Sequence, residues 1–382
     1  MKIGRSVAKL LRLRAGIVQN FARAGAFEHG MKRMLLITLF TALSLHAQES
    51  RIDRVTRDAM AERVAQALET MYIEAETAPK LAAETKRRLL TDRYLDVTPK
   101  EFAERLTADL QQQTGDGHLY VRVRAQDAEM AVPSAKEMAE TIDGLRQMMR
   151  NGPGAPPPPG RAAAYGAQAM TNMEMYRKMN YGFVEARIMD GNVGLVRVDR
   201  FAPPVPEARA AADAAMALVA NSDAIILDLR NAPGGVETMA TYLMSYFFAE
   251  ERKPLLSAYF RFADYTVPSF TSPDVPKAKR RPDVPLYILT SREVTFSAAE
   301  LLSYTLQKFG RAKVVGENTR GGGYAVQMVP LGKGVMLAVS VGKPVHPVTK
   351  GGWQIVGVVP DVAATREEAL KVAHELAAVR QP

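Results

Sequence analysis

The stretch 286–310 places a short apolar segment directly before one with helical spacing. Leu286–Thr290 (LYILT) has the length and composition of a buried strand. After a polar turn, apolar residues recur at helical spacing, at Leu302, Leu306 and Phe309. The closing Gly310 is placed to end a helix. The pattern therefore predicts a strand, a turn and a helix that begins at Ser297.

Ser297 has two interpretations at this junction. The start of a helix offers unpaired backbone N–H groups and the positive end of the helix dipole, which stabilise an oxyanion, so a serine here is well placed as a nucleophile. Serine is also a preferred helix N-cap, and Glu300 completes a capping-box pattern. These residues alone leave both interpretations open, and the rest of the chain decides between them.

Composition predicts a globular protein without a basic binding face. The chain has 382 residues, 47% of them hydrophobic, which suffices for one large or two medium domains. Its formal net charge is +9, but residues 1–47 carry eight Lys or Arg and a single Glu, so the remainder is close to neutral. We therefore expect no nucleic-acid partner. The absence of Cys excludes disulfides, thiolate zinc sites and cysteine nucleophiles.

Residues 1–47 form a leader in which 31–47 resemble a bacterial secretory signal. The basic start Met31-Lys32-Arg33 precedes a 12-residue apolar core, Met34–Leu45, and a small residue, Ala47. The core is too short to span a bilayer. We expect a periplasmic or secreted mature chain without an integral membrane span. A basic amphipathic anchor is the alternative, and the start codon is Met1, Met31 or Met34.

Residues 52–125 predict a small helical bundle. Ile52–Ile73 and Lys80–Leu95 carry helical periodicity, and Thr98-Pro99 begins a third helix. A Gly-Asp-Gly turn then leads into His118–Val123, which alternates like a strand.

Two of the five histidines are candidates for a general base. His118 stands where the bundle meets the strand, and His346 is the second candidate. A turn histidine without a chemical role is the alternative interpretation of His118.

Beyond the bundle, a low-complexity segment separates two differently patterned regions. Residues 126–180 are rich in Pro, Gly and Met and predict an insert or linker. Residues 181–382 alternate between strand and helix patterns. Predicted strands are 192–199, 224–229, 286–290, 313–316, 326–331 and 335–341, and predicted helices are 206–220, 236–248, 297–310 and 366–379. This alternation predicts an α/β fold with a largely parallel sheet covered by helices.

The segment Asp228–Gly235 (DLRNAPGG) ends a buried strand with a Gly pair before a helix. Its backbone N–H groups fit a phosphate cradle or an oxyanion hole. The dinucleotide fingerprint GxGxxG is absent. A tight turn that needs glycine geometry is the plainer alternative.

Four motifs occur together in one order: DLRNAPGG at 228–235, TFSAAE at 295–300, VVGENTRGG at 314–322 and GVVPDV at 357–362. Over residues 181–365 they resemble the catalytic domain of the C-terminal processing (tail-specific) serine protease family. Within this family, one branch contains tricorn core protease and the repeats of interphotoreceptor retinoid-binding protein. The chain resembles that branch at Asp116-Gly117-His118 and at 191–194. The resemblance implies a Clp protease/crotonase-like ββα catalytic domain, 181–382, preceded by the helical domain, 52–125.

The resemblance also implies roles for individual residues. Processing proteases carry a PDZ domain and a lysine base, but 126–180 has no PDZ-like glycine loop, and Gly322 stands at the lysine position. The tricorn-like branch instead implies Ser297 as the nucleophile and His118 as the base. The implied oxyanion donors are the backbone N–H groups of Ala298 and of Gly234 or Gly235.

Three positions depart from the pattern of that branch. Gln354 replaces a glutamate that helps to orient the catalytic histidine, and an amide in that role can cost up to ~10⁴ in turnover. Gln354 can still fix the tautomer of the imidazole, and Asp116 is a substitute acid. Ala232 replaces the usual asparagine of the Gly-pair turn, and Gly117 replaces a serine.

The residues and the resemblance together predict a serine endopeptidase or C-terminal processing-type protease. It would hydrolyse polypeptides through an acyl-enzyme on Ser297 without a metal or nucleotide cofactor. Two alternatives are a catalytically degenerate module that binds apolar ligands or peptides, and an acyl-CoA enzyme of the related crotonase fold.

Overall fold

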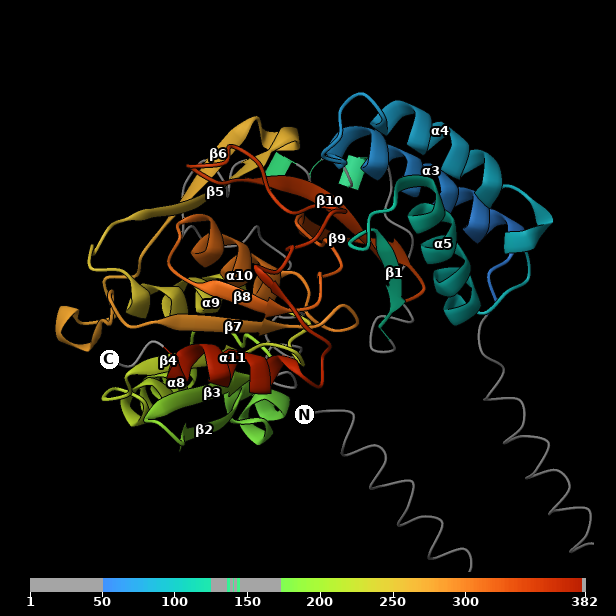
Figure 1. Ribbon diagram of the computed structural model, residues 1–382. Helices are drawn as coiled ribbons and strands as arrows, with labels where there is room; N and C mark the ends of the chain where they lie inside the picture. Colours follow the sequence, from blue (N-terminus) through green and yellow to red (C-terminus); the bar gives the residue numbers. More distant parts are fainter. Residues whose placement is uncertain (1–50, 125–135, 138–139, 141–142, 145–172, 380–382) are drawn as a thin grey trace, which may run out of the picture. The chain divides into compact units, whose positions relative to one another are not determined.

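The computed structural model describes residues 51–124, 136–137, 140, 143–144 and 173–379. The predicted leader with its secretory signal, 1–47, lies outside the described residues, as does most of the predicted insert, 126–180. The described residues belong to one compact unit built on two sheets (Figure 1). None of the helices described in these ranges combines the length and the apolar character that crossing a membrane requires.

The first sheet is largely parallel, as predicted, and has six strands in the order β11-β8-β7-β4-β3-β2. These are β2 (Phe183–Met189), β3 (Val193–Val198), β4 (Ala224–Asp228), β7 (Leu286–Thr290), β8 (Lys313–Gly316) and β11 (Val362–Ala363). All neighbours are parallel except β2, which pairs antiparallel with β3 at one edge. Every residue of β4 and β7 is buried, as expected for central strands covered on both faces. The predicted α/β fold is confirmed.

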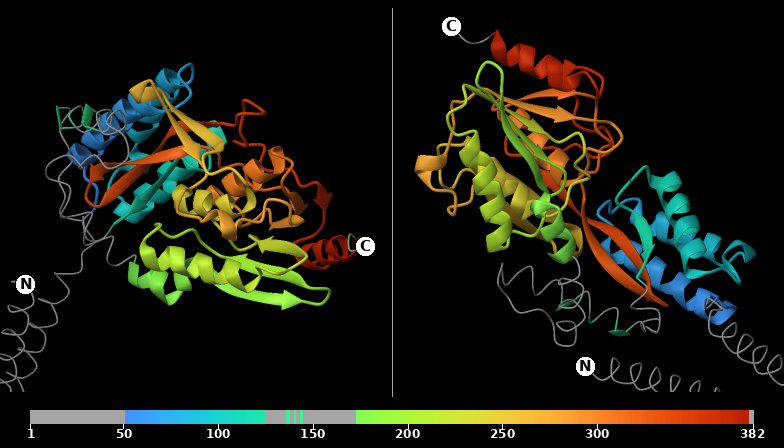
Figure 2. Two further views of the ribbon diagram at one scale, coloured as in Figure 1. Left: turned by 90° about the vertical axis from the view of Figure 1, so that its left-hand side faces the viewer. Right: turned by 90° about the horizontal axis from the view of Figure 1, so that it is seen from below.

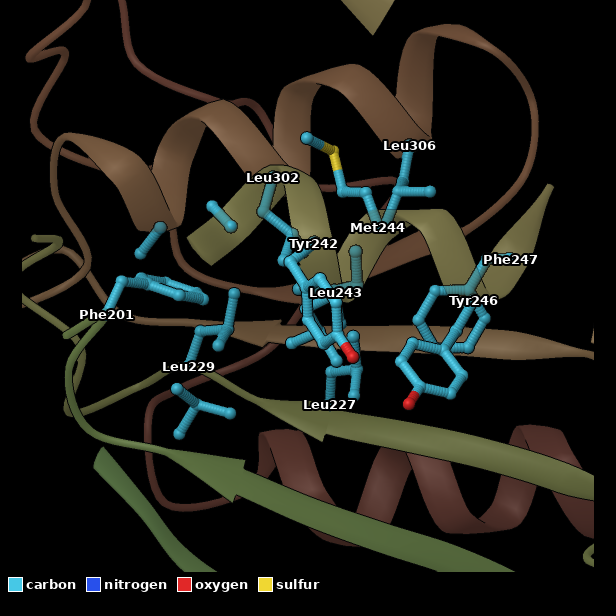
Figure 3. Close-up of a cluster of buried hydrophobic side chains, with 14 of the residues drawn as sticks. Phe201, Leu227, Leu229, Tyr242, Leu243, Met244, Tyr246, Phe247, Leu302 and Leu306 are labelled. Carbon is cyan, nitrogen blue, oxygen red and sulfur yellow. The ribbon is translucent and has the colours of Figure 1, made fainter. Parts of the chain in front are cut away.

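Helices cover both faces of this sheet. α8 (Pro206–Leu218), α9 (Glu237–Met244) and α10 (Ala298–Lys308) pack on one face, and α11 (Ala369–Ala378) packs on the other (Figure 2). Successive side chains of β4 point to opposite faces of the sheet. Leu227 packs with α8, α9 and α10, whereas Ile226 packs with α11. Figure 3 shows the larger core, in which Leu243 of α9 and Leu302 of α10 lie above Leu227.

α10 forms where the apolar spacing predicts it. Its sequence AAELLSYTLQK consists mostly of good helix formers, and Leu302 and Leu306 are fully buried. Gly310 follows with a φ of 68°, the left-handed conformation that commonly ends a helix. Because burial of a leucine contributes about 1.5–3 kcal/mol, this face holds α10 against the sheet.

The second sheet is antiparallel. It contains β1 (Tyr120–Val123), β5 (Pro254–Phe260), β6 (Tyr265–Phe270), β9 (Ala325–Gly332) and β10 (Val335–Val345). Its order is β1-β10-β5-β6, with β9 also paired to β10. The sequence patterns predict β9, β10 and β1, although β1 begins at Tyr120 rather than His118. They do not predict β5 and β6, nor β2 and β11 of the first sheet.

The N-terminal helices share their core with this second sheet. The three predicted helices are α3 (Arg54–Met71), α4 (Ala78–Leu89) and α5 (Pro99–Thr114). Their apolar side chains join one cluster with those of β9 and β10, beside which the helices lie in Figure 1. The N–H of Ile73 also donates to the carbonyl of Ser340 in β10 at 2.8 Å. The segment that carries His118 is therefore fixed to the sheet rather than hinged to it.

Truncation of Leu302 tests whether α10 is held by core packing. We expect Leu302→Ala to lower the free energy of unfolding by about 2–5 kcal/mol, because it opens a cavity in the core. The matched variant Leu218→Ala, in α8 with a side chain 50% exposed, should cost less than about 1 kcal/mol. Urea denaturation followed by circular dichroism measures both, and equal losses would contradict this packing.

Candidate active site

Ser297 lies in the turn between β7 and α10 in an unusual backbone conformation. Its φ is 55° and its ψ is −118°, whereas an ordinary N-cap residue is in the β region. Positive φ is uncommon for residues other than glycine, and such strain concentrates at functional sites. The N–H of Ser297 donates to Oε2 of Glu300 at 2.8 Å. The conformation favours the nucleophile interpretation over that of a simple cap.

Gly234 and Gly235 form the turn from β4 to α9 beside this serine. Gly234 has a φ of 97°, and a Cβ there would lie 2.8 Å from Cβ of Ser297 and 2.9 Å from N of Ala298. Only a residue without a side chain allows this approach. The N–H groups of Gly235 and Ala298 donate to no backbone or side-chain acceptor within the described residues. Two free amides next to Ser297 have the arrangement of an oxyanion hole.

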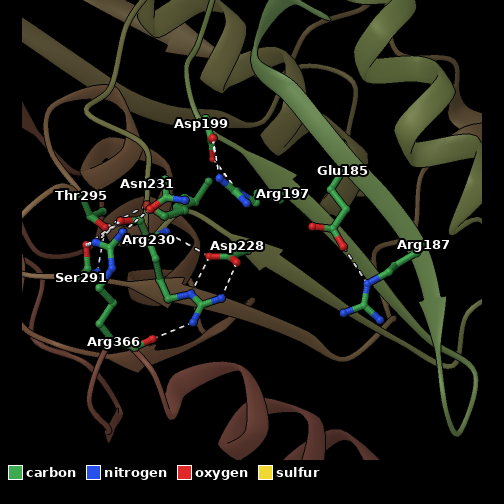
Figure 4. Close-up of polar contacts among 11 residues, drawn as sticks. Glu185, Arg187, Arg197, Asp199, Asp228, Arg230, Asn231, Ser291, Thr295 and Arg366 are labelled. Carbon is green, nitrogen blue, oxygen red and sulfur yellow. Dashed lines mark hydrogen bonds and ion pairs between the residues drawn. The ribbon is translucent and has the colours of Figure 1, made fainter. Parts of the chain in front are cut away.

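Hydrogen bonds hold these two turns together (Figure 4). Oγ of Ser291, just after β7, donates to the carbonyl of Arg230 at 2.6 Å. Oγ1 of Thr295 donates to the carbonyl of Leu229 at 2.9 Å. The guanidinium of Arg230 in turn pairs with Asp228 at 2.7 Å. The amides after β4 are therefore fixed relative to the serine after β7.

His118 and Ser297 line one cavity of about 200 Å³, together with Gly235 and Ala298. The His118 ring is buried and packs on Phe296, with ring centroids 4.5 Å apart. The structure thus brings the predicted base, nucleophile and two amides to the same site.

The second candidate base, His346, lies elsewhere. It does not line this cavity, and it packs on Phe309 with ring centroids 4.6 Å apart. Nδ1 of His346 accepts a hydrogen bond from the N–H of Val348 at 3.2 Å.

Three influences set the protonation of His118. Burial lowers its pKa most, the carboxylate of Asp116 raises it, and the positive charge of Arg320 lowers it. The resulting pKa lies below the ordinary value of about 6.5. His118 is therefore neutral near pH 7, which is the form that accepts a proton.

Gln354 contacts Asp116 rather than the imidazole. Its Nε2 donates to Oδ1 of Asp116 at 3.0 Å. Its Oε1 accepts from the N–H groups of Gly323 at 2.6 Å and Tyr324 at 3.1 Å. Both ends of the amide are therefore engaged with groups other than the imidazole.

Two buried polar atoms in this turn lack partners. Oδ1 of Asp116 accepts from the N–H of His118 at 2.9 Å, but Oδ2 of Asp116 and Nδ1 of His118 have no hydrogen bond among the described residues. Such atoms are costly when buried and are often functional.

Gly322, which the resemblance aligns with the lysine base of processing proteases, leaves no space for a side chain. A Cβ there would lie 2.2 Å from the Phe296 ring and 2.8 Å from Cε1 of His118. The histidine and its aromatic neighbour fill the volume that a lysine would need.

Glu300 has a larger role than the capping pattern predicts. Its buried carboxylate accepts from Oγ1 of Thr319 and from the N–H groups of Gly321 and Gly322, besides that of Ser297. Burial raises the pKa of this carboxyl, and the hydrogen bonds from these donors oppose the shift. Hydrogen-bond donors favour the ionised form of a carboxyl, so these partners act against the effect of burial. Glu300 thereby fixes the loop beside His118 to the start of α10.

Comparison with known proteins places the chain in a family. Residues 192–364 match the model of peptidase family S41. Residues 51–153 match the N-terminal domain of peptidase S41 in eukaryotic interphotoreceptor retinoid-binding protein. The chain belongs to peptidase family S41. The resemblance drawn from the four motifs is thus confirmed, and the second match covers the segment that carries His118.

Two carboxyl-terminal-processing proteases are similar in sequence. The protein from Picosynechococcus sp. is 30% identical over 146 residues, which cover 38% of this chain and 33% of that protein. The protein from Synechocystis sp. is 31% identical over 174 residues, which cover 44% and 37%. The aligned part of this chain spans about a third of the length of these relatives.

Solved structures share the fold at low sequence identity. A putative peptidase from Parabacteroides merdae superposes with a TM-score of 0.52 at 17% identity, over 84% of this chain and 96% of that one. A lipoprotein from Streptococcus agalactiae has a TM-score of 0.51 at 14% identity, over 85% and 97%. These similarities establish the fold of this S41 chain and no more.

The pKa of His118 can be measured directly by NMR of histidine-labelled protein. We expect a value below about 6.5 in the unmodified chain. Arg320→Gln should raise it, because a nearby positive charge disfavours imidazolium, and Asp116→Asn should lower it, because an attractive charge is lost. Shifts of both variants in the same direction would contradict this account of the site.

Proposed function

We propose that this chain is a serine peptidase of the C-terminal processing type, which hydrolyses peptide bonds in polypeptides through an acyl-enzyme on Ser297. The observation that carries the proposal is the single cavity lined by a strained serine, a buried neutral histidine and two amides without acceptors. The names of the relatives, carboxyl-terminal-processing proteases, add support.

The proposed reaction uses these groups in order. His118 accepts the proton of Ser297 as its oxygen bonds to the substrate carbonyl carbon, and the carbonyl electron pair moves to oxygen. The N–H groups of Gly235 and Ala298 stabilise that oxyanion. When the C–N bond breaks, the imidazolium gives its proton to the leaving amine. Water, deprotonated by His118, then hydrolyses the ester and frees Ser297.

In this proposal Asp116 orients His118, and Gln354 positions Asp116. The support is the unpaired Oδ2 of Asp116 two residues from the unpaired Nδ1 of His118, and the 3.0 Å hydrogen bond from Gln354 to Asp116. A carboxylate in this role holds the correct tautomer and stabilises imidazolium. The glutamine at 354 is then no sign of a degenerate site.

Ala232 is also compatible with a working site. Its carbonyl accepts from the N–H of Phe296 at 3.2 Å, so the turn after β4 still contacts the turn that carries Ser297. We further propose action in the bacterial envelope, periplasmic or secreted, because residues 31–47 carry the pattern of a secretory signal.

Fluorophosphonate labelling tests the nucleophile. We expect residues 48–382, the predicted mature chain, to form an adduct on Ser297, located by peptide mass spectrometry. Ser297→Ala should abolish the adduct and lower peptide turnover by roughly 10⁴ or more. Ser303→Ala, a buried serine of the same helix that donates to the Ala299 carbonyl, serves as the matched control and should keep both. A folded chain without an adduct would refute the proposal.

Substitutions at 116 and 354 separate the orienting acid from its support. Asp116→Asn should lower kcat by about 10²–10⁴, because the tautomer and charge at His118 are lost. Gln354→Ala should cost about 10-fold, because it loosens Asp116 without removing the carboxylate. Steady-state kinetics and thermal unfolding of both variants give the comparison. A larger loss from Gln354→Ala would identify Gln354 as the direct partner of His118.

A further inference from the structure

One acidic side chain on the cavity wall has no part in the proposed reaction. Glu237 is the first residue of α9, two residues after Gly235, and it lines the same cavity as Ser297 and His118. It forms no hydrogen bond or ion pair with any residue in the described ranges. Burial raises its pKa, and no neighbouring charge opposes that shift.

The surroundings of Glu237 are mostly apolar. Leu256 and Ala258 of β5, Leu301 of α10 and Trp353 contribute to the wall. Glu237 is the one carboxylate among the described residues that line this cavity, and no lysine or arginine is among them. An ionised carboxylate in such a place is costly unless a cation pairs with it. A cationic group on a bound molecule would supply this partner and favour the ionised form of Glu237.

The volume of the cavity limits which part of the bound molecule can enter it. Its volume of about 200 Å³ is below the ~300 Å³ at which pockets for whole small ligands begin. It therefore suits a single side chain. Lysine and arginine combine an aliphatic stem, which packs on apolar walls, with a charged head. That head would meet the carboxylate in a charge-assisted hydrogen bond.

We infer that Glu237 makes this cavity a specificity pocket for a lysine or arginine of the substrate, at the residue whose carbonyl Ser297 attacks. Gly235, the proposed amide donor to that carbonyl, lines the same cavity as Glu237, so the pocket lies beside the attacked residue. The inference rests on the proposed peptidase function and adds its substrate class. An acidic side chain or a free terminal carboxylate would be repelled from this pocket.

Stabilisation of the α9 dipole is the competing explanation for an acid in the first turn. That role would affect stability and leave substrate choice unchanged. Glu207 is a matched control, because it lies in the first turn of α8 and is exposed. Glu237→Gln and Glu207→Gln therefore remove the same charge from the first turn of a helix, inside and outside the pocket.

Peptidyl diphenyl phosphonates that differ at one side chain test the inference. Probes with lysine, norleucine or glutamate next to the phosphorus react with Ser297, and intact mass spectrometry gives each second-order rate constant. We expect lysine to exceed norleucine by at least ~10-fold, since each 1.4 kcal/mol of pairing energy gives a factor of ten. Glu237→Gln should bring this ratio near unity, and Glu207→Gln should leave it unchanged.

The outcomes separate this inference from the peptidase proposal. If the norleucine probe labels Ser297 as fast as the lysine probe, or if Glu237→Gln leaves their ratio unchanged, the pocket inference is wrong. The peptidase proposal still stands in that case. If no probe labels Ser297, the peptidase proposal fails. In that case, fluorescence anisotropy of lysine and norleucine peptides bound to the Ser297→Ala variant tests the pocket on its own. If Glu237→Gln, added to Ser297→Ala, lowers the affinity for the lysine peptide by at least ~10-fold, the pocket is supported. If both peptides bind equally well, the pocket is refuted.

Discussion

The buried carboxylate of Glu300 is the interaction on which the site depends. It accepts hydrogen bonds from the N–H of Ser297 at the start of α10 and from Thr319, Gly321 and Gly322 in the loop after β8. Gly322 in turn approaches His118 closely enough that any side chain would collide with it. One carboxylate thus links Ser297 to the loop that packs against His118. Burial raises its pKa, and the hydrogen bonds from its four donors oppose that shift.

Two separate cores position the two halves of the site. The parallel sheet and α8–α10 hold Ser297 and the Gly pair, whereas the N-terminal helices and the antiparallel sheet hold His118. Side chains then join the halves, as in the hydrogen bond from Gln354 to Asp116 and the ring contact between His118 and Phe296. The geometry of the site is therefore a product of tertiary packing on both sides.

Local patterns predicted much of the fold and part of the site. β7 and β8 have the predicted bounds because continuous apolar runs mark central parallel strands. β5 and β6 escaped prediction because their pairing with each other and with β10 is a long-range property that a short window does not contain. The motifs predicted Ser297 and His118 as site residues, and both line one cavity. The capping-box spacing predicts the contact between Glu300 and Ser297. The other partners of Glu300 and those of Gln354 lie in distant segments, and no spacing rule reveals them.

The crystal structure of the chain with a phosphonate bound to Ser297 tests the account most directly. The account predicts a phosphoryl oxygen within about 3 Å of the N–H groups of Gly235 and Ala298. It also predicts Nε2 of His118 within hydrogen-bonding distance of Oγ of Ser297, with Asp116 turned towards Nδ1. A phosphoryl oxygen directed to solvent, or an imidazole turned away from the adduct, would contradict it.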